Sequence, residues 1–250
     1  MSDFNRTARG GFADRTAAVD AGLRAYMLRV YNYMAAAVAL TGVVAWLCFQ
    51  NAVVTNEAGA ITGLTSFGQM ILGGYTPIIL MLATLGLVFF ISFRIHTLQY
   101  TTALALFMVY AALLGAALTS IFVAYTGASV ARVFFISAAS FGALSLYGYT
   151  TQRDLSAMGS FLIMGLFGII IASLVNIFLK SSGLDWAISV IGVGVFAGLT
   201  AYDTQRIKEM YDSIDDDGTM GRKAVMGALS LYLDFINLFL MLLRLVGDRR

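Results

Sequence analysis

The sequence predicts an all-α, polytopic membrane protein with seven transmembrane helices. Hydrophobic residues make up 59% of the chain and charged residues only 12%, whereas a typical soluble domain has about 25% charged residues. The apolar residues are gathered in runs of about 20 residues, the length that crosses a hydrocarbon core of about 30 Å as a helix. Backbone groups in lipid must bond within their own segment, so each run should be helical. The strict alternation that marks a membrane barrel is absent from the sequence.

The apolar runs divide the chain into one membrane domain with short ends. We expect a disordered polar tail at 1–25, a transmembrane domain at 26–247 and a short tail at 248–250. The first run is longer than the core of a signal peptide and no clear cleavage site follows it, so we interpret it as an uncleaved span. The seven segments are expected at 26–49, 76–95, 100–125, 130–150, 158–179, 185–206 and 224–246.

Composition excludes several classes of function. The chain has one cysteine, Cys48, and one histidine, His96, so a zinc site built on several Cys or His ligands is excluded. The net charge of +2 gives no reason to expect a nucleic-acid partner. The acidic run 212–217 does not fit a calcium-binding loop, because Ser213 and Ala224 would take the first and twelfth ligand positions. We therefore expect a solvated loop there, and no cofactor.

Lysine and arginine in the loops indicate the orientation of the chain. With the N-terminus in the cytoplasm, eleven basic residues lie inside, against Arg132 and Lys180 outside before the last segment. The last segment is a problem for this rule, because a full crossing places Arg244, Arg249 and Arg250 outside. A final helix shielded by the others would tolerate this, and a re-entrant segment would avoid it. The inside residues are Arg6, Arg9, Arg15, Arg24, Arg29, Arg94, Arg153, Arg206, Lys208, Arg222 and Lys223.

Small residues are frequent in the apolar segments, with 25 glycines in the chain. Gly165 and Gly168 lie in the fifth segment, and Gly194 and Gly198 form a Gly-x-x-x-Gly pattern in the sixth. Glycines in this arrangement let neighbouring helices approach closely. We favour packing inside the bundle over self-association of two chains.

Two aspartates lie within apolar segments, Asp203 in the sixth and Asp234 near the middle of the seventh. A carboxylate at membrane depth is costly, so each is a candidate functional residue. Ser230 and Asn237 share a helical face with Asp234, and Thr200 shares one with Asp203. These residues favour a polar stripe that faces the bundle interior or water rather than lipid.

Structural roles for the two aspartates stay open beside the functional one. Asp203 would also suit a carboxylate at the membrane surface, neutralised by Arg206 or Lys208. Asp234 would also suit a helix contact in which Ser230, Asn237 or a tyrosine donates to it. Tyr202 and Tyr232 each lie close enough in sequence to donate to an aspartate, or simply to pack.

An arginine at the end of the second segment is a candidate partner for the aspartates. Arg94 should lie at the same depth as Asp203, so an ion pair between them is possible, and the alternative is an ordinary basic anchor. Two carboxylates close together in a medium of low dielectric titrate as one coupled unit. Protonation would weaken an Arg94–Asp203 bond, which suggests a cation path gated by pH. Asp203 and Asp234 would then bind a calcium ion transiently.

Two stretches resemble a known family. Residues 201–211, AYDTQRIKEMY, and residues 228–247, ALSLYLDFINLFLMLLRLVG, are similar to the C-terminal signature of the Bax inhibitor-1 family, and residues 141–179 are similar to its bacterial branch. The resemblance covers roughly residues 25–247. It implies six helices around a central C-terminal helix, in the inner membrane of a bacterial cell.

The resemblance also implies a function. Members of this family form a calcium-permeable leak path whose opening depends on pH, and the family's paired aspartates match Asp203 and Asp234. Its arginine latch matches Arg94, although the residues around it agree less well. The chain ends Val-Gly-Asp-Arg-Arg, without the lysine-rich tail of the animal members.

Other functions compete with a calcium leak. Some bacterial relatives are linked to a membrane-bound protease, which suggests a regulatory protein acting through partners and the N-terminal tail. An intramembrane aspartyl protease is disfavoured because the residues before Asp234 are Leu-Tyr-Leu rather than a Gly-x-Gly turn and the sole proline is Pro77. A proton-coupled transporter is weakened by the absence of an internal repeat. We therefore expect a channel in the lipid bilayer rather than an enzyme.

Overall fold

The structure, a computed structural model, describes residues 3–57 and 60–250, with side chains from Val19 onward. Seven helical spans within these residues are long and apolar enough to cross a membrane, as the sequence predicted. The fourth and fifth helices together form one of these spans. The helices are α1 (Asp3–Ala52), α2 (Ser66–Leu72), α3 (Thr76–Arg94), α4 (Tyr100–Ala117), α5 (Thr119–Ala124), α6 (Gly127–Thr150), α7 (Ser156–Leu179), α8 (Ser182–Glu209) and α9 (Asp217–Val246).

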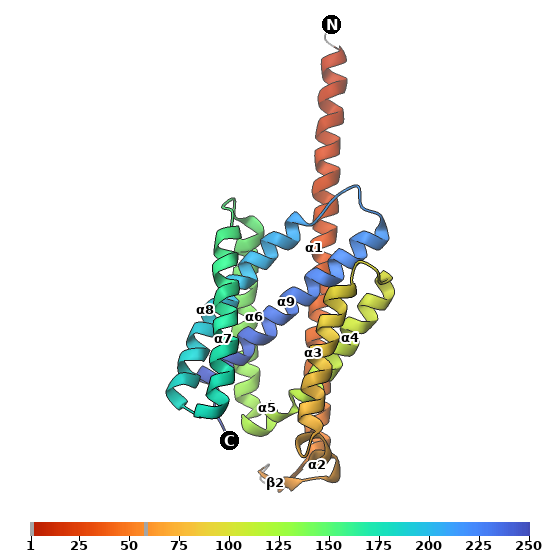
Figure 1. Cartoon of the computed structure of the whole chain (residues 1–250). Helices are drawn as coiled ribbons and strands as arrows, with labels where there is room; N and C mark the ends of the chain where they lie inside the picture. Colours follow the sequence, from red (N-terminus) through yellow and green to blue (C-terminus); the bar gives the residue numbers. More distant parts are fainter. Residues whose placement is uncertain (1–2, 58–59) are drawn as a thin grey trace.

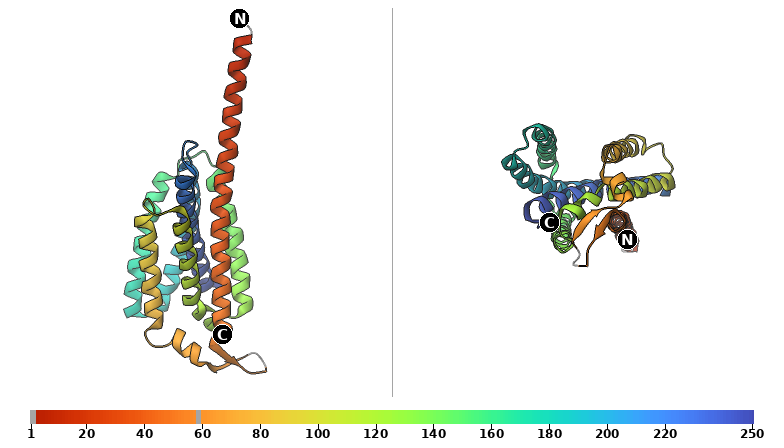
Figure 2. Two further views of the ribbon diagram at one scale, coloured as in Figure 1. Left: turned by 90° about the vertical axis from the view of Figure 1, so that its right-hand side faces the viewer. Right: turned by 90° about the horizontal axis from the view of Figure 1, so that it is seen from below.

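The first helix begins earlier than its apolar run. Residues 3–25 were expected to be disordered, but α1 is helical from Asp3 and continues past the ends of the other helices (Figures 1 and 2). Extending a helix that already exists avoids the costly nucleation step, and the alanines near residue 18 favour the helical state. The division between a tail and a membrane domain stays a prediction.

The loop between the first two spans has structure that the sequence pattern did not indicate. Strand β1 (Val53–Thr55) pairs antiparallel with β2 (Ile61–Leu64), and the short helix α2 follows. Thr65 caps α2 by accepting a hydrogen bond from the Gly68 amide. The hairpin and α2 lie at the end of the bundle opposite the N-terminus (Figure 1).

The C-terminal helix lies in the centre of the bundle. Helix α9 packs against α1, α4, α6 and α8, while α3 packs on α4 and α7 packs on α8. In the most apolar stretch of α9, 67% is buried inside the protein. The corresponding share is only 11% in α3 and in α7. Viewed along the bundle, α9 lies between the α1 and α6 side and the α3 and α7 side (Figure 2).

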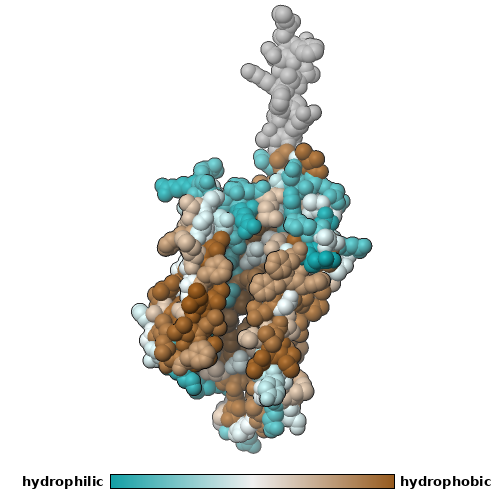
Figure 3. Space-filling model, viewed as in Figure 1, coloured by the Kyte–Doolittle hydropathy of each residue, from teal (hydrophilic) through white to brown (hydrophobic). Residues whose placement is uncertain are grey.

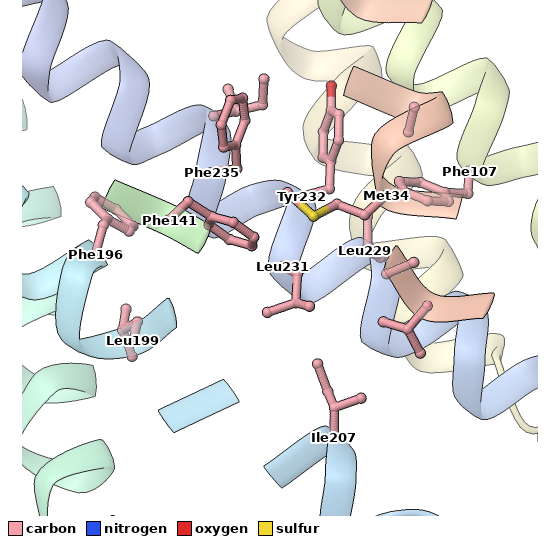
Figure 4. Close-up of a cluster of buried hydrophobic side chains, with 14 of the residues drawn as sticks. Met34, Phe107, Phe141, Phe196, Leu199, Ile207, Leu229, Leu231, Tyr232 and Phe235 are labelled. Atoms are coloured by element: carbon pink, nitrogen blue, oxygen red, sulfur yellow. The ribbon is translucent and has the colours of Figure 1, made fainter. Parts of the chain in front are cut away.

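Large side chains around α9 form the core. Phe107 and Tyr110 both meet the Tyr232 ring edge-on, at centroid distances of 5.5 and 5.9 Å. Figure 4 shows Tyr232, Phe235, Leu229 and Leu231 on α9 pointing into side chains of neighbouring helices. Burying these residues removes a helix with a central carboxylate from contact with lipid.

The outer surface matches a membrane protein. A broad hydrophobic band covers the helices, with hydrophilic residues concentrated at the two ends (Figure 3). Exposed aromatic side chains contribute to the band, including Phe93, Phe135 and Phe178. A hollow separates the lobe that carries α7 from the lobe that carries α3, and α9 runs between them (Figures 1 and 3).

The end of the chain is held at the far side of the bundle from the N-terminus. Asp248 accepts from the Arg132 side chain at 2.6 Å, and the Asp248 amide donates to the Ser129 hydroxyl. The Arg250 amide donates to the Ala124 carbonyl. Arg244 lies 3.7 Å from Asp185. Helix α9 therefore crosses the whole bundle and is not re-entrant, and its end is anchored to the turn between α5 and α6.

Glycines mark the closest helix contacts, though not all those that were expected. A Cβ at Gly198 would meet the Leu162 side chain and one at Gly165 would touch Val195, so both pack between α7 and α8. Gly168 and Gly194 face open space, with no other atom within 4 Å of an added Cβ. The Gly-x-x-x-Gly pattern therefore contributes one of its two glycines to packing inside the bundle.

Candidate functional site

The structure brings the two membrane aspartates together. Asp203 on α8 and Asp234 on α9 are close enough for their carboxyl groups to share a hydrogen bond. The Asp234 side chain is buried, with 5% of its surface exposed, and Asp203 is half-buried. Two carboxyl groups can bond to each other only when one carries a proton, because two carboxylates offer acceptors alone. A hydrogen bond between these two side chains would therefore need one shared proton.

Asp234 has no other polar partner among the described side chains. Its Oδ2 atom is buried and accepts no hydrogen bond from the described residues. Asn237 donates instead to the Leu233 carbonyl at 2.8 Å, and the Tyr232 hydroxyl bonds to Thr41 at 2.7 Å. A carboxylate that only joined helices would be fully satisfied, since an unpaired buried polar atom is costly. Asn237 and Tyr232 therefore do not supply the hydrogen bonds to Asp234 that a purely structural role was expected to use.

The other residues of the predicted stripe form no hydrogen bond with either aspartate. Thr200 is buried and donates to the Phe196 carbonyl of its own helix at 2.8 Å. Ser230 is half-buried on α9. The Tyr202 ring packs over Gly159 of α7, where a side chain would overlap it. A supporting role of these residues for the carboxyl pair stays a prediction.

The predicted ion pair between Arg94 and Asp203 is not formed. Arg94 ends α3 with an exposed side chain, and no ion pair joins it to a described residue. The charge that acts on Asp203 is Arg206, one helical turn further along α8. The two residues are apart in this conformation because α3 packs on α4, and the hollow lies between α3 and the α7 lobe (Figure 3).

The sequence analysis did not predict a chain of hydrogen-bonded hydroxyl groups that ends at Thr204, the residue after Asp203. The Tyr31 hydroxyl lies 2.7 Å from Ser145 Oγ, which lies 2.9 Å from Thr204 Oγ1. This chain joins α1, α6 and α8 and ends at the residue after Asp203. Thr204 follows Asp203 directly and Ser145 stands in an apolar run, so isolated hydroxyl residues at membrane depth were the available signal.

The acidic run before α9 stabilises the start of that helix. Both backbone amides of Gly218 and Thr219 donate to Asp216, and Lys223 pairs with Asp215 at 2.5 Å. Hydrogen bonds from Thr219, its side chain above all, hold the pKa of Asp216 below its usual value. No group of three or more His, Cys, Asp or Glu side chains suited to a metal ion occurs in the described part of the chain.

Comparisons with known proteins identify a family and several bacterial relatives of this chain. A family model described as "Inhibitor of apoptosis-promoting Bax1" matches residues 23–250. The inner membrane protein YbhL of Escherichia coli K12 is 49% identical over 232 residues, which covers 92% of this chain and 94% of YbhL. An uncharacterised protein of Rickettsia prowazekii is 49% identical and one of Caulobacter vibrioides is 45% identical, both over the full length of each chain.

These matches span the membrane helices and the carboxyl pair alike. The family model includes both Asp203 and Asp234 within its range and reaches the end of the chain. Seven apolar spans with a buried C-terminal helix agree with the fold that the resemblance implied. The chain is a multi-pass membrane protein that belongs to the Bax inhibitor-1 family.

Proposed function

We propose that this protein is a calcium-permeable leak channel whose opening depends on pH. The observation that carries the proposal is the contact between Asp203 and Asp234, with Asp234 buried and one of its oxygens unpaired among the described residues. A carboxyl pair inside a membrane bundle is an ionisable group at a place where structure alone does not require one. Calcium prefers oxygen ligands, which the two side chains supply.

The pH dependence follows from the shared proton. While the proton is present, the two carboxyl groups hold α8 and α9 together and carry one negative charge. When the proton leaves, the two like charges repel each other strongly because the surroundings are poor in water. The second charge then attracts a cation, and Arg94 is the residue proposed to bind Asp203 in that state.

The hollow between α3 and the α7 lobe supports this assignment (Figure 3). Arg94 lies exposed at the end of α3 and apart from Asp203 in the conformation described here. Binding of Arg94 to Asp203 requires α3 to move toward α8 and close the hollow. We therefore assign the proton-sharing conformation to the open state and expect a larger leak at acidic pH. Only transient binding of calcium is proposed.

We further propose that the protein lies in the inner membrane of a bacterial cell with its N-terminus in the cytoplasm. The relative YbhL is an inner membrane protein. Of the 16 basic residues, eleven lie on the side of the N-terminus. Two basic residues at the other end have acidic partners, Asp248 for Arg132 and Asp185 for Arg244.

The test is calcium entry into liposomes that hold the pure protein and a calcium-sensitive dye, followed from pH 6 to pH 8. Wild type should show a flux that falls as the pH rises. Asp203→Asn and Asp234→Asn should each flatten the pH profile, because an amide neither loses nor shares a proton. Asp20→Asn is the matched control, since Asp20 is exposed on α1. A flux no greater than that of empty liposomes at every pH would refute the channel.

A second candidate is a regulatory protein that acts on a membrane protease. It is favoured by α1, which continues past the bundle as a helix and offers a surface outside the membrane (Figure 2). Deleting residues 1–20 should abolish regulation under this function and leave calcium flux in liposomes unchanged. Asp203→Asn and Asp234→Asn should instead leave regulation intact and change the calcium flux.

A further inference from the structure

The face of the molecule between α1 and α6 is hollowed along much of the membrane. Two cavities of 810 and 470 Å³ lie one after the other and share Val38, Phe134 and Phe235. Helix α1 packs against α4 and α9, whereas α6 packs against α8 and α9. Phe235 of α9 therefore forms the floor between two separated walls. We call the two cavities together the α1/α6 groove. Each has the size of a small-molecule site, about 300–1,000 Å³.

The groove exists because its walls are made of small residues. At Gly42 and Gly142 no atom of the protein lies within 4 Å of where a Cβ would stand. The rim carries exposed apolar side chains such as Leu28, Trp46 and Leu146, so the groove opens toward lipid. The small wall residues are Ala35, Ala39 and Gly42 on α1 and Ala131, Ala138 and Gly142 on α6.

Basic side chains stand at the two ends of this apolar groove. Arg24 is the first residue of α1 that lines the larger cavity, so it marks one end of the groove. Tyr149 lines the same cavity, and the Lys208 ammonium lies 5.3 Å from the centre of its ring. Arg250 lines the smaller cavity at the opposite end. A long apolar surface that ends in a cation at headgroup depth complements a lipid that carries a phosphate.

We propose that the α1/α6 groove binds an anionic phospholipid, with an acyl chain in the larger cavity and the phosphate at Arg24. A membrane-spanning helix is too large an occupant, because a cylinder about 10 Å wide and 30 Å long fills roughly 2,400 Å³. The Tyr31 and Ser145 hydroxyl groups bond to each other from α1 to α6 across the larger cavity, so neither is left free for an occupant. The rest of the wall offers an acyl chain apolar contact. This proposal does not depend on the calcium channel.

The test uses liposomes of phosphatidylcholine that contain phosphatidylglycerol with a photoreactive diazirine in its acyl chain. After illumination, the labelled residues are identified by mass spectrometry. We expect label on α1 and α6 within the groove, and competition by unlabelled phosphatidylglycerol. Gly142→Leu should remove this label, because the Cβ of the new side chain stands in open space and the leucine projects into the groove. Gly86→Leu is the matched control, since Gly86 on α3 also faces open space outside the groove.

Ala35→Leu fills the groove from the other wall and serves if Gly142→Leu does not fold. Label that persists in the folded filled variant, or that spreads evenly over α3 and α7, would overturn the proposal. Native mass spectrometry supplies the second measurement. A dimer that is lost in the filled variants would show that the groove holds another copy of the chain, and this outcome also overturns the proposal.

The headgroup is tested by removing one charge. Arg24→Gln should reduce the preference for phosphatidylglycerol over phosphatidylcholine about fivefold, the effect expected of one basic residue at a membrane surface. Arg29→Gln on the same helix is the control, because Arg29 does not line the groove. An unchanged preference in Arg24→Gln would contradict the phosphate site.

Discussion

Single hydroxyl groups hold the central helix to its neighbours. Thr41 Oγ1 on α1 lies 2.7 Å from the Tyr232 hydroxyl on α9 and 2.9 Å from the carbonyl oxygens of Ala37 and Ala111. Thr41 therefore links three helices. In lipid no water replaces a lost hydrogen-bond partner, so such bonds should stabilise the packing of α9 against its neighbours.

Thr41→Val should destabilise the protein by about 1 kcal/mol, within the range of roughly 0.6 to 1.7 measured for bonds between membrane helices. The change keeps the shape of the side chain but leaves the Tyr232 hydroxyl unpaired. Thr84→Val is the matched control, because Thr84 is also buried but bonds only to carbonyls of its own helix. Unfolding in mixed detergent measures both, and equal losses would contradict the argument.

The cap of α9 should make stability depend on pH. Hydrogen bonds lower the pKa of Asp216, so its charged form favours the folded state. That contribution is complete above the ordinary aspartate pKa of about 4 and is lost as the pH falls through the lowered value. Asp216→Ala should therefore lower Tm more at pH 7 than at pH 2, where the carboxyl group is closer to its protonated form. Asp216→Asn should keep most of the cap at both pH values.

Thermal unfolding in detergent at the two pH values measures this effect. If Asp216→Ala lowered Tm equally at pH 7 and at pH 2, the carboxylate charge would have no role in stabilising the start of α9.

At the scale of elements, close helix contacts depend on particular glycines. A Cβ at Gly148 on α6 would overlap the Ala201 carbonyl of α8, and a backbone atom cannot move aside easily. The contact holds α6 against the helix that carries Asp203. Gly142 lies on the same helix with open space beside it.

Gly148→Ala should cost about 1–3 kcal/mol through overpacking. Gly142→Ala should be neutral or stabilising by up to about 1 kcal/mol, because alanine favours a helix more than glycine does. Thermal unfolding of the two variants in the same detergent compares them. A similar loss in both would indicate that helix α6 is sensitive to any side chain at these positions.

The sequence predicted the spans well because hydrophobicity decides which residues enter lipid. Their ends were less accurate, since capping side chains set them. Ser181 accepts from the Leu184 amide and starts α8 at Ser182, before the apolar residues begin. The segment predicted at 100–125 is interrupted at Leu118, between α4 and α5. The β1–β2 hairpin depends on a local turn that hydropathy does not report.

At the scale of the whole molecule, the candidate site was predicted only in part. Two carboxylates at membrane depth were visible as Asp203 and Asp234 because their cost in lipid singles them out. Their contact required α8 and α9 to be neighbours, which periodicity alone does not establish. The expected ion pair of Arg94 with Asp203 is absent from this conformation, because matching depth does not make two helices adjacent and α3 lies on α4.

The ends of the chain should lie on opposite sides of the membrane. Helix α9 crosses the bundle, and Arg250 is held at the far end by the Ala124 and Tyr125 carbonyls. In a Cys48→Ala background, a cysteine appended after Arg250 should react with a membrane-impermeant maleimide from outside the cell. A cysteine placed before Met1 should react only after the membrane is opened. Labelling of both ends from one side would refute the full crossing.

The most buried helix is made after the six spans that surround it. Until α9 enters the membrane, its place in the centre of the bundle is empty, and Phe107, fully buried in the finished protein, has no Tyr232 ring to pack against. The bundle can therefore close only after α9 has been made. A chain cut short before α9 would leave such core side chains without their partners.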